Sequence, residues 1–451
     1  LIYERPDQKE WGFAPQVSDD GRYLILSVWQ GTDSRNRLFY QDLSTGGPVV
    51  ELVDQLEAGF SYIGNDGPLF YLLTDLEAPR RRLVAVDLNQ PQRSSWRTVI
   101  PQAEDVLEGI TLINDQFVGL YLHHAHHQIH LFHLDGAPAG EIALPTIGSL
   151  YRYDDLGIYG HRQDKECFFA FQSFNYPTTV FRYDFKTLAS QAIFRPAINF
   201  DPQAYEIQQN FVPSKDDAKI PMYIIHRRGL KLDGQNPTLL YGYGGFNISI
   251  LPGFAVSWLV WLEMGGVLAV ANLRGGGEYG EDWHQAGMLH NKQNVFNDFI
   301  ACAEHLIQAG VTSPARLAIH GRSNGGLLVG AVLAQRPDLF GAALPAVGVM
   351  DMLRFHKFTI GWAWVSDYGS AEDAEQFKTL LAYSPLHNLH PGVSYPATLV
   401  TTGDHDDRVV PGHSFKFAAA LQAAQSGPAP ILIRIQTRAG HGFGKPTAIL
   451  I

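Results

Sequence analysis

Short apolar strands that end at an aspartate recur at a nearly fixed interval in the first part of the chain. Four copies of this pattern stand at residues 38–43, 83–88, 131–136 and 180–185. Their aspartates, at positions 42, 87, 135 and 184, are 45, 48 and 49 residues apart. Between residues 17 and about 196 each unit holds several short strands separated by Gly, Asp and Asn, without a helical period. A period in the forties with about four strands per unit is typical of β-propeller blades.

We therefore predict a partial all-β propeller domain over residues 1–204, with about four complete blades. Residues 1–4 read as the end of a strand from a further blade, so we expect the domain to be truncated at its N-terminus. An antiparallel sandwich is the alternative, but a sandwich has no reason to repeat at a fixed period.

From about residue 205 apolar strands alternate with helices, which predicts a doubly wound, mostly parallel α/β sheet over residues 205–451. The expected strands are residues 238–241, 267–272, 316–320, 343–347, 397–402 and 431–437. The expected helices are residues 295–309, 325–335, 374–381 and 412–425. Residues 197–211 lack a period, and we expect them to join the two halves.

Charge and composition narrow the function classes. The 451 residues carry a formal net charge of −11, which argues against a nucleic-acid partner and against attraction to anionic membranes. No stretch reaches the roughly 18 uncharged apolar residues that a membrane helix needs. The nearest candidate, residues 250–262, contains Pro252 and ends at Glu263. A small or peptide-like substrate fits this composition better.

The cysteines and the chain ends bear on the compartment and on completeness. Cys167 and Cys302 both lie in apolar runs, where buried free thiols are expected, and this favours a reducing, cytoplasmic compartment. The start has neither the basic region nor the long apolar core of a signal peptide. It also lacks a methionine, and the chain stops inside an apolar run, so we expect truncation at both ends.

One short motif points to chemistry. Residues 321–325 read Gly-Arg-Ser-Asn-Gly, between an apolar strand and an apolar helix with no breaker before Pro337. Gly-x-Ser-x-Gly in this context is the nucleophile elbow, a strained turn that lifts the serine Oγ clear of the sheet. Its glycines are needed where strand and helix backbones come too close for a Cβ. Ser323 is therefore the candidate nucleophile.

The partners of Ser323 are sought in loops beyond the carboxyl ends of the later strands, where α/β sheets gather their functional groups. An acidic loop with Asp404, Asp406 and Asp407 comes first, and a glycine-flanked His441 follows the last strand. This is the chain order Ser, Asp, His of α/β-hydrolases. Asp406 is best placed to reach back, whereas Asp407 has alternative roles in pairing with Arg408 or capping a helix near Pro411.

A serine hydrolase also needs donors for the oxyanion. One is normally the backbone N–H of the residue after the nucleophile, here Asn324. The second comes from the loop after an earlier strand, and residues 241–246 (YGYGGF) occupy that position. Tyr243 could supply its hydroxyl there in place of a backbone amide.

Together these segments resemble the prolyl oligopeptidase family of serine peptidases, which join a propeller to an α/β-hydrolase domain. The resemblance covers the second half densely and the propeller half in layout more than in motif. It is carried by residues 241–249 (YGYGGFNIS), 265–280 (GGVLAVANLRGGGEYG), 323–328, 335–340 (QRPDLF), 347–351 (VGVMD), 404–411 (DHDDRVVP) and 439–446.

The resemblance implies a role for each matching residue. Ser323, Asp406 and His441 would form the catalytic triad, with Tyr243 and the Asn324 amide as the oxyanion hole. A pocket for the proline side chain would be lined by Phe246, Val349, Trp364, Tyr368 and Val409. Arg408 would hydrogen-bond the carbonyl of the residue before the proline. A proline ring is flat and apolar and lacks an N–H, so an aromatic slot selects it by shape. Plain core packing is the alternative for Trp364.

The implied activity is hydrolysis of short peptides on the carboxyl side of proline through an acyl-enzyme. The resemblance further implies a propeller that restricts access to small peptides, no metal or cofactor, and a monomer with proline-containing peptides as partners. The family has seven blades and a helix after the catalytic histidine. Here four blades and ten residues after His441 are found, so we expect the C-terminal helix to be missing.

Four other functions were weighed. Residues 275–280 (GGGEYG) satisfy the Gly-x-Gly-x-x-Gly nucleotide fingerprint, but Glu278 would stand where a pyrophosphate should lie. His123, His124, His126, His127 and His130 suggest a metal, although a hairpin turn fits better. A non-catalytic interaction propeller would not need Ser323, Asp406 and His441. A relative that cleaves after basic residues, or an acylaminoacyl peptidase, should offer acids where this chain has Trp364, Tyr368 and Val349.

Overall fold

The structure is a computed structural model that describes residues 1–152 and 156–442. The chain divides into two compact units. The first unit contains Leu1–Ile198 with two short later segments, Leu251–Gly253 and Glu278–Asp282. The second unit contains Asn199–Ile250, Phe254–Gly277 and the chain from Trp283 onward. The expectation that the helix after His441 is missing concerns residues 443–451, which lie outside the described residues.

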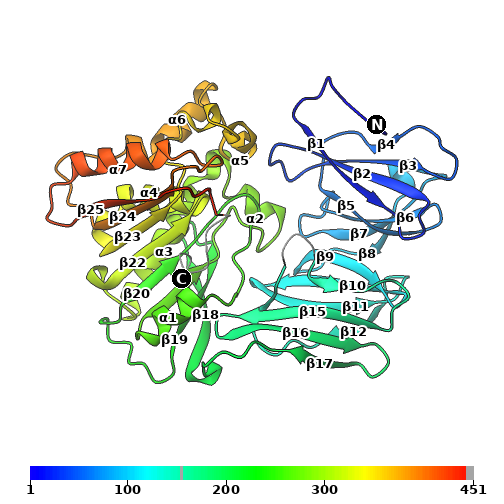
Figure 1. The fold of residues 1–451 in the computed structure, drawn as a ribbon, viewed down its shortest axis with the longest axis horizontal. Coiled ribbons are helices and arrows are strands. Elements are labelled where there is room, and N and C mark those ends of the chain that lie inside the picture. Colours follow the sequence, from blue (N-terminus) through cyan, green and yellow to red (C-terminus); the bar gives the residue numbers. More distant parts are fainter. Residues whose placement is uncertain (153–155, 443–451) are drawn as a thin grey trace. The chain divides into compact units, whose positions relative to one another are not determined.

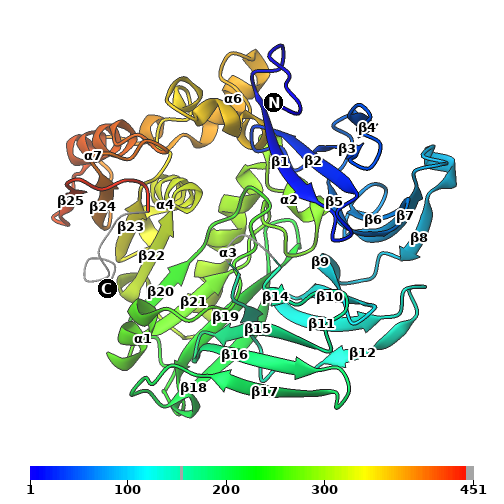
Figure 2. The same cartoon turned by 45° about the vertical axis from the view of Figure 1, so that its right-hand side comes forward.

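The first unit is built from four antiparallel sheets (Figures 1 and 2). The first sheet contains β1 (Trp11–Val17), β2 (Tyr23–Gln30), β3 (Arg37–Asp42) and β4 (Val50–Val53). The second contains β5 (Phe60–Asp66), β6 (Leu69–Thr74), β7 (Arg82–Asp87) and β8 (Arg97–Ile100). The third contains β9 (Val106–Ile113), β10 (Gln116–His123), β11 (His126–Phe132) and β12 (Pro138–Ile142). The fourth contains β13 (Ser149–Leu150), β15 (Glu166–Ser173), β16 (Tyr176–Asp184) and β17 (Ala189–Phe194), with β14 (Ile158–Tyr159) paired to β15. These four sheets correspond to the four strand-rich units that the sequence period predicts.

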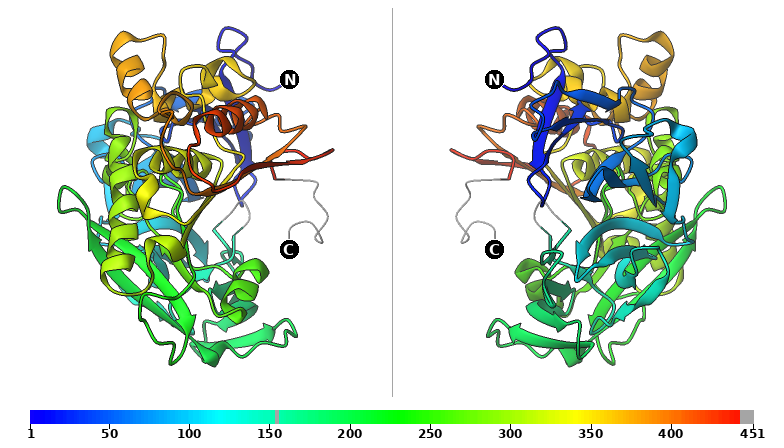
Figure 3. Two further views of the ribbon diagram at one scale, coloured as in Figure 1. Left: turned by 90° about the vertical axis from the view of Figure 1, so that its left-hand side faces the viewer. Right: turned by 90° about the vertical axis from the view of Figure 1, so that its right-hand side faces the viewer.

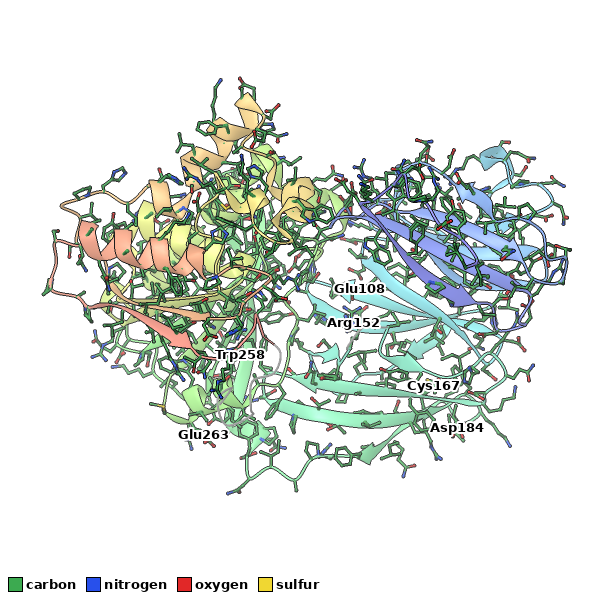
Figure 4. The ribbon with its side chains drawn as sticks, turned by 45° about the horizontal axis from the view of Figure 1, so that its top comes forward. Glu108, Arg152, Cys167, Asp184, Trp258 and Glu263 are labelled. Atoms are coloured by element: carbon green, nitrogen blue, oxygen red, sulfur yellow. The ribbon has the colours of Figure 1, made fainter. Side chains whose placement is uncertain are left out.

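The recurring aspartates lie at the end of the next-to-last strand of each sheet or just after it: Asp42, Asp87 and Asp184 are the last residues of their strands, and Asp135 follows the end of β11 by three residues. Each carboxylate accepts a hydrogen bond from the backbone N–H two residues later, at 2.8–2.9 Å. This is the Asx turn, in which a short acidic side chain replaces a backbone acceptor and reverses the chain. Figure 4 shows Asp184 at the end of β16, and Cys167 lies on the neighbouring β15. The period in the sequence therefore arises because the same turn recurs in each sheet.

Two details of the propeller prediction were wrong. Residues 1–4 form no strand, and Tyr3 instead packs edge-on against Phe13 and Phe39, with both ring centroids at 5.9 Å. The repeat also begins at Trp11 rather than at residue 17. Strand β1 contains Gly12 and Pro15, which weaken the strand pattern in a sequence. They are tolerated because β1 is the edge strand of its sheet.

The second unit contains one eight-stranded sheet in the order β18-β19-β21-β20-β22-β23-β24-β25. Its strands are β18 (Tyr205–Pro213), β19 (Lys219–Arg227), β20 (Thr238–Tyr241), β21 (Val267–Ala271), β22 (Leu317–Arg322), β23 (Ala342–Ala346), β24 (Ala397–Gly403) and β25 (Ile431–Gln436). The last six run parallel, and β18 and β19 are antiparallel. The predicted doubly wound α/β-hydrolase fold is confirmed.

Helices connect the parallel strands. They are α1 (Val256–Glu263), α2 (Glu281–Gln285), α3 (Gln293–Gln308), α4 (Asn324–Gln335), α5 (Val365–Tyr368), α6 (Ala374–Tyr383) and α7 (Gly412–Ala424). Figure 3 shows α1 and α3 on opposite sides of the sheet. Because helices cover both faces, every residue of β21 is buried. Within the described residues, no helix is long and apolar enough to cross a membrane.

The expectation that residues 197–211 only join the two halves is wrong for residues 205–211, which belong to a strand. Strand β18 begins at Tyr205 and pairs with β19 along its whole length, from Tyr205 opposite Arg227 to Pro213 opposite Lys219. Strand β18 lies at the edge of the sheet and carries Glu, Gln and Asn, so it shows no apolar alternation. Backbone pairing with a buried neighbour, rather than its own side chains, makes it a strand.

A buried ion cluster fixes the chain after β21. The Arg274 guanidinium is 2.6 Å from Asp298 Oδ1 and 3.0 Å from Asp216 Oδ1. Asp298 also accepts a hydrogen bond from the Arg274 backbone N–H and from Ser214 Oγ. The Asp298 side chain is fully buried, whereas that of Asp216 is 52% exposed. The buried carboxylate of Asp298 is therefore the main partner of Arg274, and the exposed carboxylate of Asp216 is a second, weaker partner.

Replacing Asp298 should destabilise the second unit far more than replacing Asp216. Asp298→Ala leaves a buried guanidinium without its main partner, which costs about 3–5 kcal/mol of unfolding free energy. Asp216→Ala removes an exposed partner and should cost about 1 kcal/mol or less. Chemical denaturation followed by tryptophan fluorescence measures both. Equal losses for the two variants would contradict this account of the cluster.

Candidate active site

Ser323 lies at the turn between β22 and α4, as the elbow motif predicts. Its backbone has φ 57° and ψ −117°, a conformation that side chains other than glycine rarely adopt. The turn is held in place because Ser323 N–H donates to the Ala346 carbonyl at 2.9 Å, and the Ser323 carbonyl accepts from Gly326 N–H. The strain is therefore supported by the next strand and by the first turn of α4.

The glycines of the motif are explained by close backbone contacts. A Cβ on Gly321 would lie 2.2 Å from the Gly325 carbonyl oxygen. A Cβ on Gly325 would lie 2.7 Å from the Gly242 carbonyl oxygen. No side chain fits at either separation, so strand, helix and the loop after β20 can meet only with glycine at both positions.

Strand register brings the predicted site loops to one edge of the sheet. Tyr241 at the end of β20 stands beside His320 of β22, and Arg322 stands beside Ala346 of β23. At the other side Gly403 of β24 stands beside Gln436 of β25. The strand order also reverses between β20 and β22, so their loops border the topological switch point, where α/β sheets bind ligands.

Asp406 and His441 are in direct contact. His441 Nδ1 is 2.8 Å from Asp406 Oδ2. The other oxygen, Oδ1, accepts hydrogen bonds from the backbone N–H groups of Arg408 at 3.1 Å and Val409 at 2.8 Å. The Asp406 side chain is fully buried, and that of His441 is 17% exposed. An oriented carboxyl group behind an imidazole can fix the ring tautomer and stabilise the imidazolium.

The competing acids of this loop have other surroundings. Asp404 Oδ1 is 2.7 Å from His405 Nδ1 and accepts from the Ala439 backbone N–H at 3.3 Å, so it braces the histidine loop from the outside. Asp407 is exposed, and the N-cap of α7 is Pro411, where no side chain caps the helix, so the proposed capping role is wrong. Of the three acids, Asp406 is the one in contact with His441.

The loop after β20 lies against the elbow. Asn324 Nδ2 donates to the Tyr243 carbonyl at 2.6 Å. Gly245 passes so close to the same amide that a Cβ there would be 2.7 Å from Asn324 Nδ2. Tyr243 is partly exposed, and burial of its ring raises the pKa of its hydroxyl well above the usual value. The hydroxyl is therefore held protonated, as a hydrogen-bond donor must be.

The predicted pocket residues converge on one apolar cluster. Val349, Trp364, Tyr368 and Val409 are buried in the core of the second unit, and Phe246 packs against it. The Phe246 and Tyr368 rings meet edge-on at 5.2 Å, and the Trp364 ring stacks on Phe355 at 6.4 Å. Arg408 is exposed. Trp364 therefore takes part in core packing through Phe355, as the alternative to a pocket role predicts.

Sequence reasoning missed several side chains that hold the site. Arg322 Nη2 donates to the His441 carbonyl at 3.2 Å, which ties the histidine loop to the elbow. Lys292 and Asp367 contact the loop that carries Tyr243. Arg322 occupies an unspecified position of the motif, and the other two lie on helical segments far from any motif. Only the three-dimensional contacts reveal them.

The histidine-rich segment forms a tight hairpin between β10 and β11, with His123 opposite His126. His127 is buried, 2.7 Å from Glu108 Oε2, and accepts from the Leu150 backbone N–H. Arg152 lies 2.7 Å from the other Glu108 oxygen; Figure 4 labels both residues. Burial raises the pKa of Glu108, but His127 and Arg152 outweigh it and lower it to about 2. Glu108 is thus already paired with an arginine, which disfavours a bound cation.

The glycine-rich segment after β21 is a packing feature. Gly275 has φ 87°, and a Cβ there would lie 3.0 Å from the Gly244 carbonyl. Gly275 also accepts a hydrogen bond from the Asn247 backbone N–H at 3.0 Å. The segment is followed by the five-residue α2 rather than by the long helix of a dinucleotide-binding unit. It supports the Tyr243 loop from behind.

Two family models match this chain. Residues 252–450 match the model of the prolyl oligopeptidase family, and residues 1–194 match that of the prolyl oligopeptidase N-terminal β-propeller domain. A prolyl endopeptidase of Elizabethkingia meningoseptica is 45% identical over 96% of this chain and 60% of its own length. Prolyl oligopeptidase A of Galerina marginata is 38% identical over 99% of this chain and 61% of its own length. The chain thus spans about three fifths of the length of these relatives.

Solved structures give the same result. A structure from a study of two prolyl endopeptidases superposes with a TM-score of 0.92 at 41% identity, over 98% of this chain and 64% of that one. Prolyl oligopeptidase B of Galerina marginata, bound to a 35mer hydrolysis and macrocyclization substrate, superposes with a TM-score of 0.94 at 35% identity, over 100% of this chain and 64% of that one. On the strength of both domain matches and these likenesses, the chain belongs to the prolyl oligopeptidase family.

Proposed function

We propose that this protein is a serine-type endopeptidase that hydrolyses short peptides on the carboxyl side of proline. The observation that carries the proposal is the Asp406–His441 contact on the sheet edge where the elbow presents Ser323. The relatives named prolyl endopeptidase and prolyl oligopeptidase support the reaction class and the preference for proline.

In the proposed reaction His441 removes the proton from Ser323 Oγ as this oxygen bonds to the carbonyl carbon of the proline residue. The negative charge that develops on the carbonyl oxygen is stabilised by the Tyr243 hydroxyl and the Asn324 N–H. The tetrahedral intermediate then breaks its C–N bond, and His441 gives the proton to the leaving amine. Water, activated by His441, releases the acyl group, while Asp406 stabilises the imidazolium in both halves.

Specificity for proline would come from Phe246, Val349, Trp364, Tyr368 and Val409. All five belong to or pack on the apolar core cluster, which supplies flat rings and no acidic group among them. Such a slot favours a flat apolar ring and gives a basic side chain no counter-charge. Arg408 is exposed and would donate to the peptide carbonyl before the proline. This composition favours proline over cleavage after basic residues or release of acylated amino acids.

The remaining features of the proposal concern the environment of the enzyme. Cys167 and Cys302 are both free and buried, which supports a reducing, cytoplasmic location. Short proline-containing peptides would be its partners, and the propeller would restrict access to them. No cofactor enters the mechanism. A monomeric state remains a prediction.

Ser323 should be the single site of reaction with a fluorophosphonate probe. Ser323→Ala is expected to abolish labelling and to lower kcat by at least about 10⁴-fold, because the nucleophile itself is removed. Ser426→Ala, at an exposed serine of the same unit, should label like the unmodified protein. Gel fluorescence and peptide mapping measure the outcome. Absence of labelling in the unmodified protein would refute the enzyme and favour an interaction propeller.

A succinyl-Gly-Pro chromogenic substrate should be cleaved with a kcat/KM at least about 100-fold above that of the matching Arg substrate. The reason is that the apolar slot offers no partner that offsets the cost of burying a cation. Trp364→Ala should lower kcat/KM for the proline substrate, with much of the change in KM. Initial rates at varied substrate concentration give both constants. Equal rates on the two substrates would rule out the proline pocket.

Tyr243→Phe should lower kcat by about 10²–10³-fold, since it removes one oxyanion donor. Burial raises the pKa of Tyr243, so the hydroxyl stays protonated as the pH rises through the usual range of tyrosine. The ratio of wild-type to variant kcat should therefore stay constant from about pH 7 to about pH 10. Tyr383→Phe, at a buried tyrosine whose hydroxyl has no partner among the described residues, is the control. A ratio that approaches one at pH 10 would show that Tyr243 had ionised.

A further inference from the structure

A buried lysine lies directly behind the predicted oxyanion loop. Lys292 stands at the start of α3, and its side chain is 1% exposed. Its Nζ donates to the Gly244 carbonyl at 2.8 Å and to Asn324 Oδ1 at 3.3 Å. Gly244 is the residue after Tyr243, and Asn324 is the residue after Ser323. One cation therefore contacts both backbone segments from which the oxyanion donors come.

The charge that balances Lys292 holds the other end of the same loop. Asp367 Oδ1 is 3.8 Å from Lys292 Nζ. Asp367 Oδ2 accepts from the Phe246 backbone N–H at 2.8 Å and lies 3.0 Å from His284 Nε2. The Asp367 side chain is 3% exposed. The loop is thus held at the Gly244 carbonyl by a cation and at the Phe246 amide by an anion, and the two charges attract each other.

The Asn324 side chain completes the connection. Its Oδ1 accepts from the Tyr368 hydroxyl at 2.8 Å as well as from Lys292, and its Nδ2 donates to the Tyr243 carbonyl. Lys292 Nζ also lies 5.3 Å from the Tyr368 ring. Tyr368 is a predicted pocket residue, so the network joins the nucleophile turn, the oxyanion loop and the pocket.

Fold stability alone does not account for this arrangement. Burying a lysine and a carboxylate costs solvation free energy, and apolar residues in place of a buried ion pair are often neutral or stabilising. Burial indeed lowers the pKa of Lys292, although Asp367 opposes the shift. What the pair supplies, and apolar residues cannot, is a donor for the Gly244 carbonyl and an acceptor for the Phe246 amide. These two hydrogen bonds hold a loop that belongs to no helix or strand.

We propose that Lys292, through Gly244, Asn324 and the charge of Asp367, is a positioning residue that sets the oxyanion donors relative to Ser323. This inference rests on the proposed role of Ser323 as nucleophile but not on the preference for proline. A displacement of reacting groups by about 1 Å can cost about 10²-fold in rate. Loss of Lys292 should therefore reduce transition-state stabilisation more than it reduces substrate binding.

The test compares Lys292→Met with Lys416→Met in the full chain. Lys416 pairs with the buried Asp351 in the same unit but contacts neither the oxyanion loop nor Asn324 in the described contacts, so it controls for the loss of a buried carboxylate's partner. A double variant, Lys292→Met with Asp367→Asn, removes both charges and keeps an acceptor for the Phe246 N–H. The double variant replaces the single variant in the test if the single variant does not fold. Circular dichroism and thermal melting establish folding.

Four readouts separate positioning from general loosening. For Lys292→Met we expect kcat to fall about 10–100-fold with KM within about threefold. Affinity for a peptidyl-prolinal aldehyde, whose carbonyl oxygen enters the oxyanion hole once Ser323 adds to it, should fall by a similar factor. Affinity for the matching peptidyl-pyrrolidine, which fills the pocket but has no carbonyl for the oxyanion hole, should not change. The rate of fluorophosphonate labelling should fall as well.

The outcomes are distinct for the two proposals. Labelling of the unmodified protein tests the role of Ser323. The ratio of kcat between the Lys292→Met variant and the unmodified protein tests the role of Lys292. In a Tyr243→Phe background the effect of Lys292→Met should shrink, because the donor that it positions is gone. Equal losses of aldehyde and peptidyl-pyrrolidine affinity, full additivity with Tyr243→Phe, or behaviour identical to Lys416→Met would each overturn the inference.

Discussion

The close crossing of β22 and α4 at Ser323 is the constraint on which the rest of the site depends. The serine adopts a positive φ that costs free energy, and it is retained because the Ala346 carbonyl and the first turn of α4 hold it. Such a crossing requires glycine at positions 321 and 325, and it brings the Gly242 carbonyl within contact of the helix. Backbone contact at Gly242 therefore fixes where the loop that carries Tyr243 begins, and the rest of the loop is held by side chains.

Charged groups around this crossing are arranged so that each has a defined partner. One oxygen of Asp406 accepts from two backbone N–H groups and the other contacts His441, which fixes the orientation of the carboxyl group. Behind the opposite side of the serine, Lys292 and Asp367 serve the carbonyl of Gly244 and the amide of Phe246. Backbone groups that lie outside regular structure need such partners when buried, and here the partners are charged. The site thus combines a strained turn with loops held by ionised side chains.

The sequence predicted those parts of the fold that repeat or alternate. The four aspartate turns were visible because each Asx turn uses the same residue at the same place, and the parallel strands were visible as apolar runs. Strand β18 was missed because its partner, not its own composition, makes it a strand, and residues 1–4 were misassigned because ring packing on Phe13 and Phe39 leaves an apolar pattern without a strand. Ser323 and the choice of Asp406 and His441 could be proposed from chain order and loop position. Lys292, Asp367 and Arg322 could not, because nothing in a linear sequence marks a side chain whose role is set by two distant backbone carbonyls and an amide.

Arg322 shows why the unspecified positions of a motif matter for this site. It lies between Gly321 and Ser323, so its backbone cannot move without moving the nucleophile, and its guanidinium donates to the carbonyl of His441 itself. The side chain of Arg322 therefore connects the turn at Ser323 to the loop of His441, independently of the contact between Asp406 and the His441 ring. Asp404 adds a second connection on the other side of the loop through the Ala439 amide. A histidine loop held from both sides by residues next to the nucleophile and next to the acid needs less ordering when substrate binds, and preorganisation of this kind is where enzymes gain most of their electrostatic stabilisation.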